Sequence, residues 1–280
     1  MSSPLYGHYT PLSGLIGIVK SQTLWATNIK FLNDEHEFQH AIDLIKNIVK
    51  NAKITKDHSD YNAYQEFKTH VNSRLNHLSN YDTESVFTLS FSEQTDLLSQ
   101  WRGYCPANNG YCIIFDVTKL YEEVKSKIKD CHLVKCIYDL KDKETRLKKV
   151  LNEYWGKYLK VNNDKARIKL FDELEEELML LASYFKHPSF EEEKEHRIVV
   201  ILPYAADGDL LFREGRFSLI PYIELPASRK TIKKICIGPT AHKELTKRAL
   251  ETFLEKCFEF PVTTFSDLEI TFASTPYRPW

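Results

Sequence analysis

The stretch LYGHYTPLSGLIGIVKSQTLWATN, residues 5–28, decides how the chain begins to fold. Its short apolar start ends at His8 and Thr10. Apolar residues then recur at i, i+3, i+4 and i+7, which predicts an amphipathic helix over 12–20 with Thr10 or Ser13 as its N-cap. The final TLWATN alternates as a strand does. The stretch therefore predicts a strand, a helix and a second strand, with His8 at the mouth of the first turn.

Later segments continue this pattern. A second helix is expected to begin at Asn33 or Asp34, because a capping side chain there precedes acidic residues that the helix macrodipole favours. The turn PANNG at 106–110 predicts a hairpin-like connection between the strands on either side of it. Further elements are expected as a helix over 60–79 and strands over 85–92, 111–117, 131–139 and 196–203.

Together these elements predict an α+β fold, with a central mixed or antiparallel sheet and helices packed against it. The 280 residues lie near the upper end of what one domain holds. We expect residues 1–280 to form a single domain, with a lysine-rich, mainly helical insertion around 119–185.

Composition limits the classes of function. The formal net charge is -1, so no overall charge draws the molecule toward nucleic acid or membranes. No apolar run approaches the roughly 18 residues of a membrane span, and the N-terminus lacks the order of a secretory signal. The six cysteines form no C-x-x-C pair and lie mostly in apolar runs, which indicates reduced, buried thiols. We expect a cytoplasmic protein without a membrane segment or a metal site.

Charge is unevenly distributed along the chain. Residues 119–169 hold 15 Lys or Arg against 8 Asp or Glu, whereas residues 172–195 hold 9 acids against 2 lysines. The structural interpretation is a pair of solvated helices that lie against each other. The functional interpretation is a basic surface for nucleic acid or another polyanion beside an acidic loop.

The first candidate cluster is His8, Tyr9 and Thr10. An imidazole at a strand end can bind a ribose hydroxyl, while the Thr10 hydroxyl or a helix amide binds a phosphate or carboxamide. A histidine at this position is also commonly structural.

The second candidate cluster begins on the strand FTLSFS, where Ser90 and Ser92 share one face because side chains alternate. Just downstream, Trp101 offers an aromatic plane, Arg102 a guanidinium for a phosphate or carboxylate, and Tyr104 a phenol. Core packing is the alternative for Trp101. An internal carboxylate, Asp96 or a glutamate, is the alternative partner for Arg102.

The third candidate cluster enters the strand at 196. Glu193 and Glu195 are two residues apart and therefore on one side, and Arg197 follows on that side. A carboxylate pair can serve as a general base or stabilise a cation, with the arginine keeping one carboxylate ionised. A solvated acidic loop with one salt bridge is the alternative.

These motifs resemble a bacterial family of unknown function whose members begin with segments like LYHYTS. The matching segments recur in order along nearly the whole chain, and they are His8-Tyr9-Thr10, TLWATN with FLNDEHEF, residues 89–93, Gln100-Trp101-Arg102 with GYCIIF, FKHPSFEEEKEHRIVV, IGP at 237–239 and STPYR at 274–278.

The opening is also similar to that of ADP-ribosyltransferases, in particular the DNA-modifying toxins of the DarT type and the RNA 2'-phosphotransferases. This resemblance implies a split sheet and NAD as substrate, with no metal. It gives His8 the nicotinamide ribose, Thr10 the carboxamide side, and Glu195 or Glu193 the acidic role that polarises the ribose.

The same resemblance implies the rest of the NAD site. Ser90 or Ser92 with Tyr104 would form the pocket wall, and Arg102 would face the pyrophosphate. The remaining residues expected to contact NAD are Tyr9, Trp25, Trp101 and Arg197.

Cleavage of the nicotinamide bond passes through a ribosyl oxocarbenium ion, which a nearby carboxylate stabilises without a metal or a protein nucleophile. The resemblance implies an NAD-consuming ADP-ribosyltransferase or glycohydrolase, in toxin or phage-defence work, acting on nucleic acid or protein. The alternatives are a non-catalytic module that binds nucleotide or nucleic acid, and a metal-independent nuclease that uses His8, Arg102 and Glu195. The oligomeric state stays open.

Overall fold

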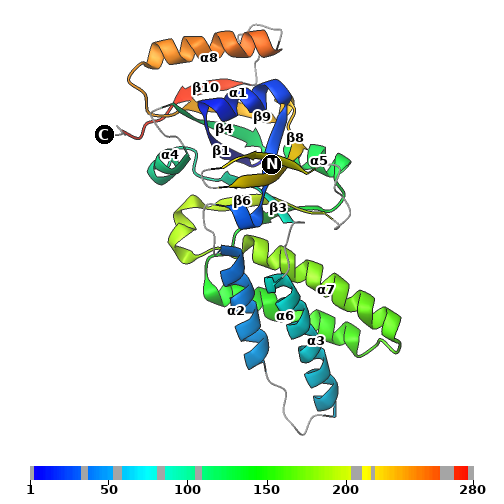
Figure 1. Ribbon diagram of the computed structural model, residues 1–280. Coiled ribbons are helices and arrows are strands. Elements are labelled where there is room, and N and C mark those ends of the chain that lie inside the picture. The colour runs from blue at the N-terminus through cyan, green and yellow to red at the C-terminus, as the bar shows by residue number, and fades with distance from the viewer. Residues whose placement is uncertain are drawn as a thin grey trace.

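The computed structural model describes residues 3–32, 37–52, 59–80, 86–104, 109–202, 210–215, 218–258 and 268–276. The expected caps Asn33 and Asp34 and most of the PANNG turn lie outside these residues. The described part is an α+β structure with a ten-stranded mixed sheet (Figure 1). Its strands are β1 (Leu5–Pro11), β2 (Thr23–Asn28), β3 (Val86–Ser92), β4 (Gly110–Asp116), β5 (Cys131–Lys135), β6 (Glu195–Ile201), β7 (Leu211–Glu214), β8 (Leu219–Pro226), β9 (Ile232–Ile237) and β10 (Glu269–Phe272).

The helices cover both faces of this sheet (Figure 1). The α-helices are α1 (Leu12–Ser21), α2 (Glu37–Asn51), α3 (Tyr61–Asn80), α4 (Leu98–Tyr104), α5 (Val117–Lys127), α6 (Leu140–Tyr158), α7 (Asp164–Tyr184) and α8 (Lys243–Phe258). The short 3-10 helices are η1 (Ile29–Phe31), η3 (Pro188–Glu193) and η5 (Arg229–Thr231). Among the described residues, no helix is both long and apolar enough to cross a membrane.

The main path through the sheet runs in the order β10-β9-β4-β1-β3-β2-β8-β7. β6 pairs with the edge of β3 opposite to β1 and β2, and β5 pairs with β6. β9 and β10 are parallel, whereas the other pairs are antiparallel. β1 and β2 share one edge of β3, because Gly7 pairs with Ser92 while Thr27 pairs with Thr88. Between these two registers β1 and β2 diverge, and the sheet is split.

Each face of the sheet carries its own core. Phe87, Leu89 and Phe91 of β3 point into a core shared with α1, α5 and α8, and we call this side the α1 face. Val199 of β6 and the alternate residues of β3, such as Val86, point to the helical layer α2, α3, α6 and α7, and we call this side the α7 face. Figure 1 shows that layer as a separate group of helices beneath the sheet.

The expected insertion at 119–185 is mainly helical, because α6 and α7 form half of the helical layer. It also supplies β5, which pairs with β6. Four described cysteines are buried free thiols and Cys257 is partly exposed.

Two expectations about connections are wrong. The N-cap of α1 is Pro11, with no side-chain cap; the amide of Leu12 instead donates to the Asn109 carbonyl at 3.0 Å, so a neighbouring backbone replaces Thr10 or Ser13. The strands around PANNG do not form a hairpin, because β4 pairs with β1 and β9 rather than with β3.

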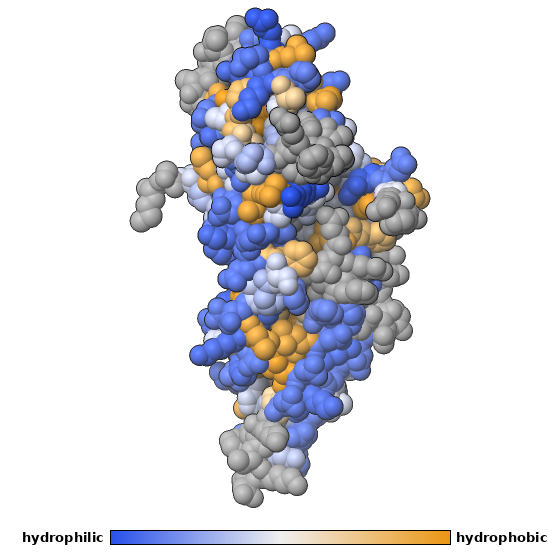
Figure 2. All heavy atoms as spheres, turned by 90° about the vertical axis from the view of Figure 1, so that its left-hand side faces the viewer, coloured by the Kyte–Doolittle hydropathy of each residue, from blue (hydrophilic) through white to orange (hydrophobic). Residues whose placement is uncertain are grey.

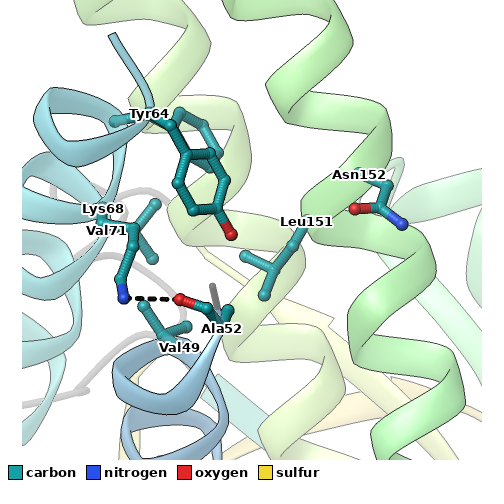
Figure 3. A pocket seen from close by; sticks show the side chains of 8 residues that line it. Val49, Ala52, Tyr64, Lys68, Val71, Leu151 and Asn152 are labelled. Atoms are coloured by element: carbon teal, nitrogen blue, oxygen red, sulfur yellow. Dashed lines mark hydrogen bonds between the residues drawn. The ribbon is translucent and has the colours of Figure 1, made fainter. Parts of the chain in front are cut away.

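On the side of the molecule shown in Figure 2, the helical layer is mostly hydrophilic, with an apolar area between hydrophilic borders. A small pocket lies within this layer, between the end of α2, α3 and α6 (Figure 3). Its volume of about 20 Å³ is room for roughly one water molecule. Lys68 reaches across and donates to the carbonyls of Lys50 and Ala52, at 3.0 and 2.8 Å, where a cation suits the C-terminus of α2. We interpret the pocket as a packing gap.

Candidate functional site

The sheet split brings His8 against β3. Nδ1 of His8 lies 3.0 Å from the carbonyl oxygen of Ser90, in the part of the β3 edge where neither β1 nor β2 pairs. A carbonyl only accepts, so Nδ1 carries the proton and Nε2 is left as an acceptor. Burial lowers the pKa of His8, against the opposing effect of the Ser90 bond, and therefore favours the neutral ring. His8 therefore presents Nε2 as a hydrogen-bond acceptor in a fixed position. A protonated Nε2 would instead be a donor.

Thr10 is not open to a ligand. It lies on the same face as His8, two residues along β1, and is buried beneath α1. A Cβ on Gly14 would overlap the Thr10 hydroxyl, so glycine allows α1 to sit directly on this side chain. The expected role of Thr10 on the carboxamide side is wrong, because α1 occupies that space.

Glu195 and Arg197 belong to a buried ionic network on the α7 face. Glu195 accepts from Arg197 Nε at 2.7 Å and from Lys186 Nζ, and Lys186 also donates to Glu193 at 2.6 Å. Arg197 donates in addition to the carbonyl of Ser183 at 2.6 Å. Burial alone would raise the pKa of Glu195, but the charges of Arg197 and Lys186 hold it at about 2. The network ties β6 to the end of α7.

His8 and Glu195 do not converge. His8 pairs with Ile113, which lies in the core of the α1 face, whereas Glu195 pairs with Ser92 on the α7 face. Directly opposed residues of antiparallel strands share a face, so the sheet separates the two side chains. The expectation that His8 and Glu195 hold one ribose is therefore wrong, and Arg197 is enclosed by its own bonds rather than exposed to NAD.

The two serines of β3 also lie on the α7 face, as their alternation predicts. The Ser92 hydroxyl donates to the carbonyl of Glu193 at 2.6 Å and accepts from the amide of Gln94 at 2.9 Å, so it shapes the turn after β3. Ser90 is partly exposed and contributes its carbonyl to His8. Only Ser90 lies in the split.

Trp101 and Tyr9 are structural. Trp101 is fully buried, contacts the ring of Tyr9 edge-on, and donates from Nε1 to Asp96 at 2.7 Å. The Tyr9 hydroxyl donates to the carbonyl of Gln94 and accepts from the amide of Leu97, at 2.7 and 2.9 Å. These bonds fix α4 on β1, which confirms the core-packing alternative for Trp101.

Asp96 is committed to the C-terminal segment as well as to Trp101. One of its oxygens accepts from the amide and hydroxyl of Ser274 and from the amide of Thr275. Both of its oxygens are therefore bound by partners other than Arg102. Arg102 and Tyr104 are exposed at the end of α4, which leaves their expected contacts with NAD as predictions.

Sequence reasoning missed the polar residues that share the α1 face with His8. Tyr6 stacks on His196 with ring centroids 4.2 Å apart, and Nδ1 of His196 lies 3.7 Å from Glu93. Glu93 accepts from Lys135 at 2.7 Å, and this hydrogen bond lowers the pKa of the carboxylate. His196 is buried, and its Nδ1 has no hydrogen-bond partner among the described residues. The sequence does show His and Glu residues at strand ends, but it does not show which face of the sheet each side chain occupies.

The basic residues of 119–169 are spread over α5, β5, α6 and the start of α7. Several are matched along their own helix, as in the pairs Lys148–Glu144 and Lys157–Glu153. The basic α6 lies beside the acidic α7, as the structural interpretation expects (Figure 1). A nucleic-acid role for this segment stays a prediction.

Residues 100–198 match a family model described as Protein of unknown function (DUF2971). The match covers 99 of the 280 residues (198 − 100 + 1) and runs from α4 to β6, including Trp101, Lys186 and Glu195. It agrees with the resemblance to a family of unknown function. No curated protein and no solved structure matches the chain.

Proposed function

We propose that this protein binds NAD at the α1-face end of the split and cleaves its nicotinamide bond, as an ADP-ribosyltransferase-like enzyme. The residues of the proposed site are Tyr6, His8, Glu93 and His196. The observation that carries the proposal is His8 in the split, with Nδ1 bound to Ser90 and Nε2 left to accept from a ribose hydroxyl.

The acidic role passes to Glu93 in this proposal. Glu93 interacts with His196, which lies on the face of His8, and its side chain is 28% exposed, whereas both oxygens of Glu195 are buried in ion pairs. The lowered pKa of Glu93 keeps it ionised, which is the state that stabilises a cation. Nδ1 of His196 lies 3.7 Å from Glu93, so this imidazole and the carboxylate lie together at the proposed site.

The chemical step needs few groups. The bond between ribose C1' and the nicotinamide nitrogen breaks, and its electron pair goes to the departing ring. The positive charge is left on the ribose, where the Glu93 carboxylate stabilises it. Water, or a hydroxyl or amine of an acceptor, then bonds to C1' and loses a proton.

A second candidate is binding of NAD without turnover. Glu93 already neutralises the ammonium of Lys135 at 2.7 Å, and this pair weakens the field that the carboxylate exerts on a ribosyl cation. Binding without nicotinamide release would favour this candidate.

The test is nicotinamide release from NAD by the whole protein, with three variants. His8→Asn can still donate to Ser90 but has no atom in the place of Nε2, and Glu93→Gln removes the charge. Glu193→Gln is the matched control, because Glu193 also binds a lysine but on the α7 face. We expect His8→Asn and Glu93→Gln to lower release by about 10²- to 10³-fold and Glu193→Gln to leave it nearly unchanged. Release that is unaffected by His8→Asn and Glu93→Gln would refute the assigned site, and an inactive wild type would refute turnover.

A further inference from the structure

Outside the split, the α7 face of β2, β8 and β7 carries an exposed tryptophan, Trp25, which lies on the buried ring of Tyr222. Trp25 is 46% exposed and lies on Tyr222, with ring centroids 4.4 Å apart. Nε1 of Trp25 donates to Glu224 at 3.2 Å, so the indole is held at both its ring face and its edge. One side of the indole rests on Tyr222, and its exposed surface offers a flat apolar plane.

Arg213 of β7 lies on this same face beside Tyr222. The face follows from register, because Leu211 pairs with Tyr222, which pairs in turn with Thr27, and Arg213 is two residues from Leu211. The guanidinium donates from one terminal nitrogen to the Thr27 hydroxyl at 3.3 Å, a long bond to a neutral group.

Within the part of the chain that the structure describes, no acidic side chain pairs with Arg213. Among the described residues, no carboxylate forms a salt bridge with Arg213, and its Nε is buried without a hydrogen-bond partner. Burial lowers the pKa of Arg213, as expected for a cation that has lost water. A partly buried guanidinium has lost hydration, and an anion bound to its terminal nitrogens would offset that cost.

We propose that this face, defined by Trp25, Tyr222 and Arg213, binds a nucleotide, with the base stacked on Trp25 and the phosphate at Arg213. Exposed indoles stack any base because every base has a π-face, and a guanidinium fits a phosphate by planar, paired hydrogen bonds. The Glu224 carboxylate accepts from Trp25 Nε1, so it has a partner of its own on this face. The site lies on β2, β8 and β7, across the split from β1, and the proposal does not depend on turnover of NAD.

The experiment measures binding without NAD, so it is independent of the proposed enzyme activity. The probes are AMP, adenosine and a fluorescently labelled single-stranded 12-mer oligonucleotide, followed by tryptophan fluorescence or anisotropy. We expect Trp25→Ala to weaken AMP or the oligonucleotide by about 5- to 150-fold, the range for one stacked base. Arg213→Gln should weaken the phosphate-bearing probes, leave adenosine unchanged, and lower the salt slope of oligonucleotide binding by about one.

Two matched variants control for side effects. Phe212→Ala removes a similarly exposed ring from the opposite face of β7, and Lys20→Gln removes an exposed cation from α1. Both should bind as the wild type does. Binding of AMP supports a mononucleotide site, and binding of the oligonucleotide alone supports a strand. If no probe binds, or if Trp25→Ala and Arg213→Gln bind as tightly as the controls, the proposal is wrong.

Discussion

His8 and Ser90 are joined across the split sheet, where Nδ1 of the histidine donates to the serine carbonyl at 3.0 Å. This bond replaces the strand pairing that the edge of β3 lacks at this point. The same contact satisfies a backbone group and fixes the tautomer of the side chain. Structural and functional interpretations of His8 are therefore compatible.

The pH dependence of the free energy of unfolding should show that His8 is neutral in the folded protein. Burial lowers its pKa in the folded protein below the ordinary value of 6.5, so the unfolded chain binds more protons at acidic pH. The stabilising contribution is complete above pH 6.5 and declines as pH falls through 6.5 toward the lowered pKa. Denaturant unfolding at pH 7.5 and 5.5 should show a smaller decline for His8→Asn than for the wild type. Equal declines in both proteins would contradict a neutral His8.

The contribution of Glu195 to stability should be lost at a lower pH than that of His8. Its pKa of about 2 lies below the ordinary 4.5, so its contribution is complete above pH 4.5 and is lost as pH falls toward 2. At neutral pH, Glu195→Gln removes the buried carboxylate that neutralises Arg197 and Lys186. We therefore expect a loss of about 3 to 5 kcal/mol in the free energy of unfolding. Glu193→Gln should cost less, since that side chain is 16% exposed. Equal losses in the two variants would argue against a central role for Glu195.

The two glycines of α1 should respond in opposite ways. Gly14→Ala places a Cβ in the space of the Thr10 hydroxyl and should destabilise the fold by about 1 to 3 kcal/mol through overpacking. A methyl group added at Gly17 would meet no atom within 4 Å apart from its chain neighbours and the backbone of its own helix, so Gly17→Ala should stabilise the helix by about 0.5 to 1 kcal/mol. Thermal unfolding of both variants measures this difference. A neutral Gly14→Ala would mean that α1 moves freely on β1.

Asp96 should anchor the C-terminal segment. Asp96→Asn turns an acceptor into an amide donor opposite the donors of Ser274 and Thr275, which should cost about 1 to 3 kcal/mol. We also expect faster proteolysis beyond Ala273, measured by mass spectrometry of a limited digest. Asp43→Asn is the control, because Asp43 is at the surface of α2 and accepts from Gln39. Identical cleavage in the two variants would remove the anchoring role.

Local patterns predicted the elements well. The helix expected over 12–20 is observed at Leu12–Ser21, and that expected over 60–79 at Tyr61–Asn80, because both depend on short-range periodicity. The faces of the sheet could not be predicted, since they depend on register between strands about 85 to 115 residues apart, and a slip of one residue reverses them. For this reason His8 and Glu195 were expected to meet. Lys186 was missed because a single lysine beside a phenylalanine carries no pattern that marks it as buried.

The placement of β1 has a consequence for synthesis on the ribosome. Its main partner is β4, and His8 pairs with Ile113, which emerges 105 residues later (113 − 8). At roughly 5 to 20 residues per second, the first strand waits for about 5 to 20 s before this main partner has been synthesised. During that interval the nascent chain exposes an apolar segment that ribosome-associated chaperones can hold, and rare codons before residue 110 would lengthen its exposure.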